Sequence, residues 1–522
     1  MRRILSGCML ILFFLSTSCT DDLPNLNEKQ ITDQDLTMDA NEGGILLPGM
    51  ENSIVQTSAG QYQSDQNHNG DSFIGYLVSP TPFQGNIQNI TYAMSDTWNN
   101  RVWTAPTENL LNQWVQMKKK SFDTKYPDLY AISLICKVFV GQRLVDVFGP
   151  IPYTQYGQAS EVSFDSEQEA YDAFFTDIDW AINALTEAED ADPSADQLRF
   201  AKFDKSQYGG DYSKWIKVAN TLKLRLAMRI SLVDPVKAQK EAEEAVSQKY
   251  GVLEDGDGSL AITPPTENPI EQIAFSWGDT RVGAPIVTYL MGFHDPRLAK
   301  YALPATDPAA AGQYIGIRNG IDITSKDTYV NFSEPNVSKT DPVKVMDVAE
   351  SYFLRAEGAL RGWNMGGGTA QQFYEDGVRA SFSENNVGGV EEYLQDDVST
   401  QTAYVDPKNP DNNSPAVSTI TIKWDDNDSF DRKLERIMTQ KWIALYPEGR
   451  EAWAEFRRTG YPKMYLNVVN YSNGIIPAND FIKRLTYPTA ITNASKEAVD
   501  EAVSKYLDGK DTQYTAIWWD VN

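Results

Sequence analysis

The stretch that decides the fold is YSKWIKVANTLKLRLAMRIS, residues 212–231. Its large apolar side chains recur every three or four positions, at Trp215, Val218, Leu222, Leu226 and Ile230. This spacing follows the turn of an α-helix and places one apolar stripe along one face. Asp234 and Pro235 come next, and an N-cap residue before a proline predicts that a second helix begins there.

Helical spacing of the same kind occurs in four further segments, at residues 126–147, 166–185, 344–363 and 432–460. Gly149 and Pro150 end the first of them, and Ser166 with Glu169 forms a capping box at the start of the second. The turns between partner helices are short. We therefore expect a mostly α fold built of antiparallel helix pairs that stack on one another, as in helical repeat proteins. No clean tetratricopeptide signature is present, so this expectation rests on geometry.

Two long stretches interrupt the helical spacing, at about residues 252–340 and 385–431. Both are rich in Gly, Pro, Asn and Asp, and the second contains a strand-like piece, STITIKW, at residues 418–424. Long loops of this kind often carry binding sites. The sequence therefore predicts a helical scaffold with two loop-rich excursions.

The N-terminus has the pattern of an export signal. Arg2 and Arg3 precede an apolar run, Ile4–Leu15, and small residues then lead to Cys19. The run is too short to span a bilayer, which takes about 20 apolar residues. The pattern resembles a bacterial lipobox, in which Cys19 is acylated; the alternative is an ordinary signal peptide with a chance cysteine. We predict a lipoprotein signal at 1–18, an acidic tether at 19–41 and a folded body at 42–522.

Charge and cysteine content restrict the function further. The net charge is −26, and such a field repels phosphate backbones, so we expect no nucleic-acid partner. Removal of the signal and acylation of Cys19 would leave Cys136 as the remaining cysteine, so no disulfide framework is expected. Cys136 lies in an apolar helix, which indicates a buried thiol rather than a nucleophile. Arg225 and Arg355 also lie on mostly apolar faces, and we interpret them as buried ion pairs between helices.

Seven phrases occur together and in a recognisable order along nearly all of the mature chain. They are CKVFVGQRLVDVFGPIPYTQ, YSKWIKVANTLKLRLAMRIS, FHDPRLAKY, YIGIRNG, VAESYFLRAEGALRGW, QKWIALYPEGREAWAEFRRTGYP and the terminal IWWD. With the lipobox before them, the chain resembles the SusD/RagB family, nearest to its SusD-like, starch-binding-associated branch. The pair Asp21–Asp22 after the cysteine also resembles the acidic signal that sends some lipoproteins to the outer face of the outer membrane.

The resemblance implies four tetratricopeptide-like helix pairs in a curved scaffold, with a less regular portion that carries the ligand site. It also implies a lid on a SusC-like, TonB-dependent outer-membrane transporter, anchored by lipid and facing the cell exterior. In that role the protein captures an oligosaccharide or a peptide and delivers it to the barrel. Neither catalysis nor a cofactor belongs to this role.

Ligand contact should come from aromatic and polar side chains on loops, because sugar rings stack on Trp and Tyr while polar groups bind their hydroxyls. Two aromatic segments stand out, at residues 70–106 and 274–290. The candidate ligand-binding residues are Tyr76, Phe83, Trp98, Trp103, Trp277, Asp279, Arg281 and Tyr289. The alternative for each aromatic residue is a place in the core, since Trp and Tyr are heavily buried on average.

The segment DQNHNGD, residues 65–71, matches the first half of a calcium loop. The glutamate that would complete the loop is replaced by Tyr76, so we interpret the segment as an Asx-rich turn, and we expect no metal site.

Two other functions remain open at this point. A surface glycoside hydrolase would need two carboxylates across a cleft, which a chain with 72 acidic residues can supply. A helical scaffold that binds another protein's peptide would need only a groove.

Overall fold

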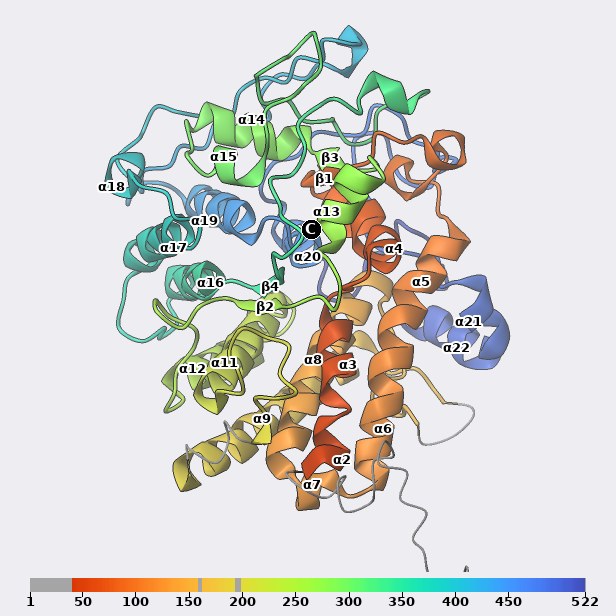
Figure 1. Cartoon of the computed structure of the whole chain (residues 1–522), viewed down its shortest axis with the longest axis vertical. Coiled ribbons are helices and arrows are strands. Elements are labelled where there is room, and N and C mark those ends of the chain that lie inside the picture. Colours follow the sequence, from red (N-terminus) through yellow and green to blue (C-terminus); the bar gives the residue numbers. More distant parts are fainter. Residues whose placement is uncertain (1–39, 158–161, 193–198, 522) are drawn as a thin grey trace, which may run out of the picture.

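The structure of the chain is a computed structural model that describes residues 40–157, 162–192 and 199–521 (Figure 1). Cys19, the predicted signal and the tether up to residue 39 lie outside the described residues. Helices dominate the described part and strands are few and short, which confirms the predicted fold class. No described helix is both long enough and apolar enough to cross a membrane.

Four helix pairs form the scaffold. Their bounds are α8 (Pro127–Phe148) with α9 (Glu167–Ala191), α11 (Tyr212–Arg229) with α12 (Pro235–Ser247), α16 (Val348–Leu360) with α17 (Ala370–Glu384), and α19 (Phe430–Leu445) with α20 (Gly449–Thr459). Neighbouring pairs touch through α9 and α11, α11 and α16, and α16 and α19. In Figure 1 the pairs follow one another from α8 and α9 near the bottom to α17 and α19 higher on the left. The predicted stack of helix pairs is therefore confirmed.

The sequence signals at helix ends act as predicted. Ser166 Oγ accepts a hydrogen bond from Glu169 N at 3.2 Å, and Glu169 Oε2 accepts one from Ser166 N at 2.9 Å. Asp234 caps α12 by accepting from Lys237 N at 3.1 Å. Gly149, at φ 82°, ends α8 in a conformation that other residues rarely adopt.

Further helices pack around the scaffold, and several of them carry no clear signal in the sequence. The N-terminal ones are α2 (Asn41–Gly44), α3 (Leu47–Ile54), α4 (Ala59–Tyr62), η2 (Gln63–Asp71), η3 (Phe83–Asn86), η4 (Asn89–Thr91), α5 (Asp96–Pro106), η5 (Thr107–Leu111), α6 (Asn112–Lys119) and α7 (Phe122–Lys125). The C-terminal ones are α21 (Thr489–Ala494) and α22 (Lys496–Tyr506), which lie beside α5 in Figure 1.

The loop-rich excursions contain only short elements. They are β2 (Leu260–Ile262), α13 (Pro269–Glu271), η6 (Gln272–Ser276), β3 (Arg281–Val282), α14 (Ala284–Gly292), α15 (Leu298–Tyr301), η7 (Lys326–Thr328), α18 (Val390–Tyr393) and η8 (Pro410–Asn412). The strands β1 (Leu77–Val78) and β3 pair antiparallel, as do β2 and β4 (Val343–Met346), with one register irregularity beside Leu260.

The piece STITIKW, residues 418–424, forms no strand, so that prediction is wrong. Its apolar residues do alternate inward, but its carbonyl groups are bound by side chains of neighbouring helices. Tyr374 Oη donates to the oxygen of Ile422 at 2.6 Å, and Arg436 Nε donates to that of Thr421 at 3.1 Å. Side-chain donors thus take the place of a neighbouring strand.

The interior between the helix pairs contains a network of buried charges. Arg225 pairs with Glu350 at 2.7 Å, which confirms the predicted buried ion pair. Arg229 pairs with Glu451 at 2.6 Å and with Glu455 at 2.7 Å. These pairs link α11, α16 and α20. Because isolated charges are rarely buried, each member depends on its partners.

Arg355 is buried as expected, but the predicted buried ion pair between helices is wrong for it. It donates to Glu254, an exposed loop residue, at 3.0 Å and to the backbone oxygen of Met365 at 3.1 Å. The interpretation of Cys136 holds. Cys136 is a free, buried thiol in α8, and burial raises the pKa of this thiol well above its ordinary value. A thiol held in its neutral form is a poor nucleophile.

The π-helix η2 packs closely on the start of α20. A Cβ atom added at Gly70 would lie 2.9 Å from Arg450 N, so this approach requires glycine. Asp71 bridges the two elements, because its carboxylate accepts from Gly449 N at 3.2 Å and from Tyr62 Oη at 3.1 Å.

Burial raises the pKa of Asp71 to about 7, with repulsion from Glu448 adding to the rise while hydrogen bonds from Gln66 and Tyr62 oppose it. Between about pH 4 and pH 7 the folded protein therefore keeps a proton that the unfolded chain has lost, and the free energy of unfolding falls as pH rises. We expect Asp71→Asn to flatten this fall by up to about 1.4 kcal/mol per pH unit, measured by urea unfolding across that range. An unchanged slope would contradict this assignment, and Asp123→Asn on exposed α7 is the control.

Candidate functional site

Three aromatic side chains come together where the loop-rich part meets α5. His68 of η2 stacks on Trp98 of α5, with ring centroids 4.3 Å apart and an angle of 10° between the planes. Phe83 of η3 packs edge-on against both rings, at 4.9 Å from His68 and 6.0 Å from Trp98. His68 is buried, while Phe83 and Trp98 are half-buried. We call His68, Phe83 and Trp98 the aromatic cluster.

Buried amide side chains hold the elements of the aromatic cluster together. Asn89 Nδ2 donates to Asn69 Oδ1 at 2.7 Å and to Asn99 Oδ1 at 3.1 Å. Asn89 Oδ1 accepts from Ser95 N at 2.7 Å. One side chain thus connects η2 to the start of α5, which fixes Trp98 relative to His68.

The turn after Phe83 is strained. Gln84 has φ 54° and Asn86 has φ 68°, so two non-glycine residues are left-handed within three positions. Each such residue costs of order 1 kcal/mol and persists only where the surroundings hold it. Here Asn86 Nδ2 donates to the oxygen of Ile321 at 3.1 Å. This left-handed turn places Phe83 against Trp98 and leaves Gln84 exposed.

Polar side chains adjoin the aromatic cluster. Asp279 Oδ1 accepts hydrogen bonds from Thr81 Oγ1 at 2.6 Å and from Lys326 Nζ at 2.8 Å. Lys326 Nζ also donates to the backbone oxygen of Trp277 at 2.6 Å, and the Trp277 side chain is 38% exposed. The oxygen of Thr81 accepts from Phe83 N at 2.8 Å, which connects the two groups. We call Thr81, Trp277, Asp279 and Lys326 the polar rim.

The imidazole of His68 supports the indole of Trp98 as an uncharged ring. Burial lowers the pKa of His68 to about 3, and the charge of Asp279 opposes this only in part. The ring is therefore neutral at physiological pH. Because the imidazole of His68 covers one face of the Trp98 indole, a ligand can approach that indole only from its other face and its outer edge. A flat aromatic surface beside a carboxylate and an ammonium group suits the C–H face and the hydroxyl groups of a sugar ring.

Four of the eight candidate residues meet at this site: Phe83, Trp98, Trp277 and Asp279. The other four are buried and do not belong to this site. They are Tyr76, Trp103, Arg281 and Tyr289. The structure gives them a structural role instead, because their rings and polar atoms contact other parts of the protein.

Each buried candidate has a structural partner. Tyr76 Oη donates to the backbone oxygen of Trp442, and Tyr289 Oη donates to that of Lys463 at 3.0 Å. The ring of Trp103 packs against three other aromatic rings. Arg281 Nε donates to the oxygen of Val330 at 2.6 Å, and its guanidinium pairs with Glu334 at 3.2 Å.

Sequence reasoning missed His68 and Lys326. His68 lies in DQNHNGD, which is a buried π-helix rather than an Asx-rich turn. The backbone of this segment is satisfied internally, for example by Asn69 Nδ2, which donates to the oxygen of Ser64 at 2.8 Å. Among the described residues, no group of His, Cys, Asp or Glu side chains could hold a metal ion.

Solved structures resemble this fold closely. A chitin-binding SusD homologue from Flavobacterium johnsoniae shares 40% identity and a TM-score of 0.88, covering 92% of this chain and 99% of that one. A SusD-like protein from Bacteroides thetaiotaomicron shares 36% identity at a TM-score of 0.85, and a SusD homologue from Bacteroides uniformis shares 35% at 0.84. Both cover 92% of this chain and 99% of their own.

A comparison with curated protein sequences finds no match. The family model described as "SusD-like: Susd and RagB outer membrane lipoprotein" matches residues 24–520, which is nearly the whole chain. Together with the structural likeness, this match shows that the chain belongs to the SusD/RagB family of outer-membrane lipoproteins.

Proposed function

We propose that the protein binds an oligosaccharide at the aromatic cluster and the polar rim, without cleaving it. The observation that carries the proposal is the half-buried indole of Trp98, backed by neutral His68 and connected through Phe83 and Thr81 to Asp279. The indole offers a rigid stacking surface. Asp279 binds Thr81 and Lys326 through Oδ1, and within the described part of the chain its Oδ2 is left for a hydroxyl or amide N–H of the ligand.

The relative from Flavobacterium johnsoniae supports a choice of ligand, because it is described as chitin-binding and shares 40% identity with this chain. We propose oligomers of β-linked N-acetylglucosamine as the first ligands to test. Their sugar rings expose flat C–H faces, and their N-acetyl groups supply the N–H donors that Asp279 can bind.

The proposed site predicts binding without hydrolysis. In isothermal titration calorimetry, chitohexaose is expected to bind saturably, whereas maltohexaose of the same length binds more weakly. A reducing-end assay on the same samples should stay at its background level. New reducing ends formed at enzymatic rates would show that the protein is a glycoside hydrolase and not a binding protein. If neither chitohexaose nor maltohexaose binds, the proposed site is contradicted.

We further propose that the bound oligosaccharide passes to a SusC-like, TonB-dependent transporter in the outer membrane. The family description as an outer-membrane lipoprotein supports this partner. Affinity purification from membranes with the full chain is expected to recover a large outer-membrane barrel. If the main protein recovered is soluble, the result would favour the alternative function, in which the helical scaffold binds a peptide of another protein.

The anchor is the remaining part of the proposal. Acylation of Cys19 would tie residues 42–522 to the outer membrane through the tether at 19–41, with the aromatic cluster facing the cell exterior. The lipobox-like pattern and the family description support it. Mass spectrometry of the mature N-terminal peptide tests it, and an unmodified cysteine there would contradict it.

A further inference from the structure

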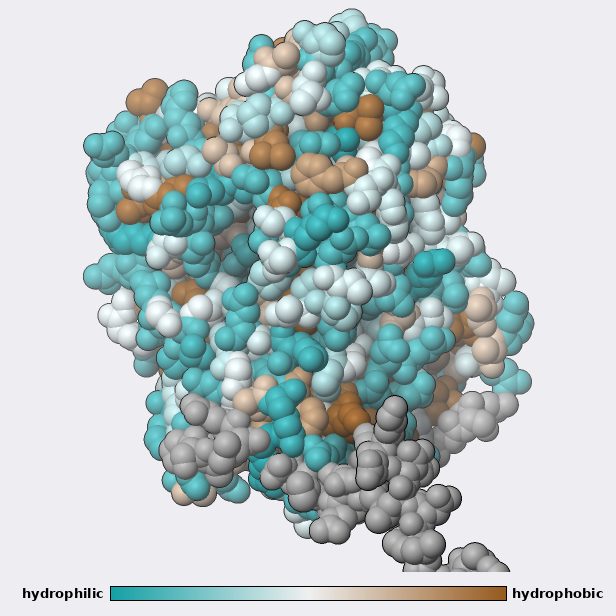
Figure 2. Space-filling view, in the orientation of Figure 1, coloured by the Kyte–Doolittle hydropathy of each residue, from teal (hydrophilic) through white to brown (hydrophobic). Residues whose placement is uncertain are grey.

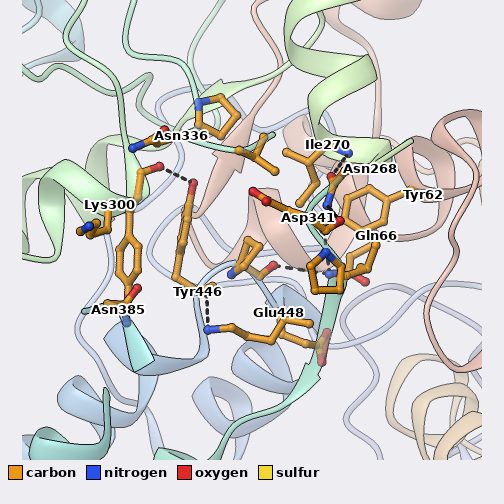
Figure 3. Close-up of a pocket in the computed structure, with 17 residues that line it drawn as sticks. Tyr62, Gln66, Asn268, Ile270, Lys300, Asn336, Asp341, Asn385, Tyr446 and Glu448 are labelled. Carbon is orange, nitrogen blue, oxygen red and sulfur yellow. Dashed lines mark hydrogen bonds between the residues drawn. The ribbon is translucent and has the colours of Figure 1, made fainter. Parts of the chain in front are cut away.

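A cavity separate from the aromatic cluster lies where distant segments of the chain meet (Figure 3). It has a volume of about 230 Å³. Its walls come from η2, the start of α13, the end of α15, residues 335–344 and the turn at residues 446–448. In Figure 3, Lys300, Asn385 and Tyr446 lie on one side, and Gln66, Asn268 and Asp341 lie on the other.

Amide side chains line this cavity and differ in what they can still bind. Asn268 is satisfied, because its Oδ1 accepts from Ile270 N at 2.9 Å and from Glu271 N at 3.4 Å. Gln66 Nε2 donates to Tyr62 Oη at 3.1 Å and to Asp71 Oδ1 at 3.1 Å, which fixes the orientation of the amide. Its Oε1 is buried and accepts no hydrogen bond from any described residue. This oxygen has almost no accessible surface, so a ligand in the cavity does not reach it, and Gln66 forms a fixed polar part of the wall.

Two other amides, exposed Asn336 and half-buried Asn385, lie nearer the mouth of the cavity. Asn336 Nδ2 donates to the oxygen of Ala299 at 2.9 Å, and Asn385 Nδ2 donates to that of Ser381 at 2.8 Å. The side-chain oxygens of both are left as open acceptors within the described part of the chain. A ligand that satisfies these amides must therefore supply several O–H or N–H donors.

The charges on the cavity wall are already compensated. Glu448 pairs with Arg143 at 2.9 Å, and Lys344 pairs with Asp347 at 2.9 Å. Lys300 and Asp341 lie on opposite sides in Figure 3 and cancel in net charge. Open acceptors repel anions such as carboxylates and phosphates, and no excess negative charge attracts a cation. The chemistry favours a neutral ligand rich in hydroxyl groups.

Size and shape restrict the ligand further. A volume of 230 Å³ equals that of roughly eight water molecules and lies below the range of about 300–1,000 Å³ that is typical for drug-sized ligands. Tyr301 and Tyr446 stack with ring centroids 4.6 Å apart and add a buried aromatic wall. The cavity thus has room for one sugar ring.

We propose that this cavity binds a single neutral sugar residue, as a second site distinct from the aromatic cluster. Asn336 and Asn385, whose side-chain N–H groups are bound within the protein, accept hydrogen bonds from its hydroxyl groups. The two sites lie near opposite ends of one helical segment, since Ile270 lines the cavity and Trp277 belongs to the polar rim, about 10 Å further along. The cavity does not depend on the aromatic cluster for any of its contacts.

Saturation-transfer NMR with glucose, galactose, mannose and N-acetylglucosamine tests this proposal on the full chain. At least one of the four is expected to bind with a millimolar Kd. Val337→Trp, which fills the cavity from its half-buried rim, should weaken that binding at least tenfold, and Asn336→Ala at an exposed position should weaken it about threefold. Trp98→Ala should leave it within about twofold of the parent value.

The outcomes separate the two sites. If none of the four sugars binds, or if binding survives both Val337→Trp and Asn336→Ala, the cavity holds only water and the proposal is overturned. If Trp98→Ala abolishes monosaccharide binding, the sugar occupies the aromatic cluster and the second site does not exist. Melting curves of each variant show whether the protein remains folded, and Asn336→Ala keeps the test valid if Val337→Trp does not fold.

Discussion

Replacing Trp98 with alanine is expected to weaken chito-oligosaccharide binding by about tenfold or more, equal to at least about 1.4 kcal/mol. The indole is the largest partly exposed ring of the aromatic cluster, and the imidazole of His68 stacks on its inner face. Its loss removes the stacking surface and leaves the polar rim to bind alone. Titration calorimetry with chitohexaose measures the change, and Trp98→Phe should give an intermediate value.

Trp180→Ala is the matched control for this variant. Trp180 is also half-exposed, at 36%, and it packs edge-on against Tyr130 at 5.3 Å. It lies on α9, which is at the far end of the molecule from the loop-rich part in Figure 1. Both variants lose a partly exposed indole, and Trp98→Ala loses two ring contacts where Trp180→Ala loses one, so Trp98→Ala should be at most slightly less stable. Equal binding by Trp98→Ala and the parent protein would show that the ligand sits elsewhere.

The second large effect concerns the buried charge network. Arg229→Met is expected to lower the free energy of unfolding by about 3–5 kcal/mol, because it removes a cation that several buried carboxylates share and leaves their negative charge undercompensated. Arg229 is fully buried and contacts Glu451, Glu455 and, at 3.4 Å, Asp146. Methionine fills much of the same volume, so the loss reports charge rather than packing. Urea unfolding monitored by circular dichroism measures it.

The pH dependence of this variant gives a second signature. Burial alone would raise the pKa of Glu455, but Arg458, Lys441 and Arg229 outweigh it and hold that pKa well below its ordinary value. The stability that these pairs contribute is present above the ordinary glutamate pKa of 4.5 and is lost as pH falls below it. The difference between Arg229→Met and the parent should therefore stay nearly constant from pH 7 to about 4.5 and shrink as pH falls further.

The control for the charge network lies at the surface. Lys505→Met on α22 also removes a cation that pairs with a carboxylate, that of Glu501, but both side chains are more than half exposed. Exposed pairs contribute about 0–1 kcal/mol, so this variant should stay close to the parent. If Arg229→Met proved no more destabilising than Lys505→Met, the buried network would not hold the helix pairs together.

The helix pairs could be predicted from the sequence because their signals are local. Apolar stripes such as Trp215 to Ile230 and caps such as Ser166 act within a few residues of where they occur. The prediction of a strand at STITIKW was wrong because its alternating pattern is typical of a strand. In the structure, Tyr374 of α17 and Arg436 of α19 bind its carbonyl groups instead. A local pattern reports which side of a segment is buried, but not what buries it.

The site was only half predictable for the same reason. Phe83 and Asp279 are nearly 200 residues apart, and their proximity depends on Thr81 bonding to Asp279, which nothing local encodes. Tyr76 and Tyr289 belong to the same aromatic-rich segments as Phe83 and Trp277, yet they lie in the core. His68 is surrounded by Asn and Asp residues that are typical of exposed turns, and only the packing of η2 against α20 buries it.

Most of the molecular surface in Figure 2 is hydrophilic, with hydrophobic residues in small scattered patches. Extended apolar patches that would mark a large dry interface are therefore not evident on this face. A ligand that binds there must be recognised through a few aromatic rings set among polar groups. The aromatic cluster and its polar rim have this composition.

The most direct test of the central claim is a crystal structure of the protein with chitohexaose bound. We expect a sugar ring to lie flat on the face of Trp98 opposite His68, with a hydroxyl or amide group of the ligand hydrogen-bonded to Asp279. An oligosaccharide bound at any other surface, with Trp98 and Asp279 untouched, would contradict the account.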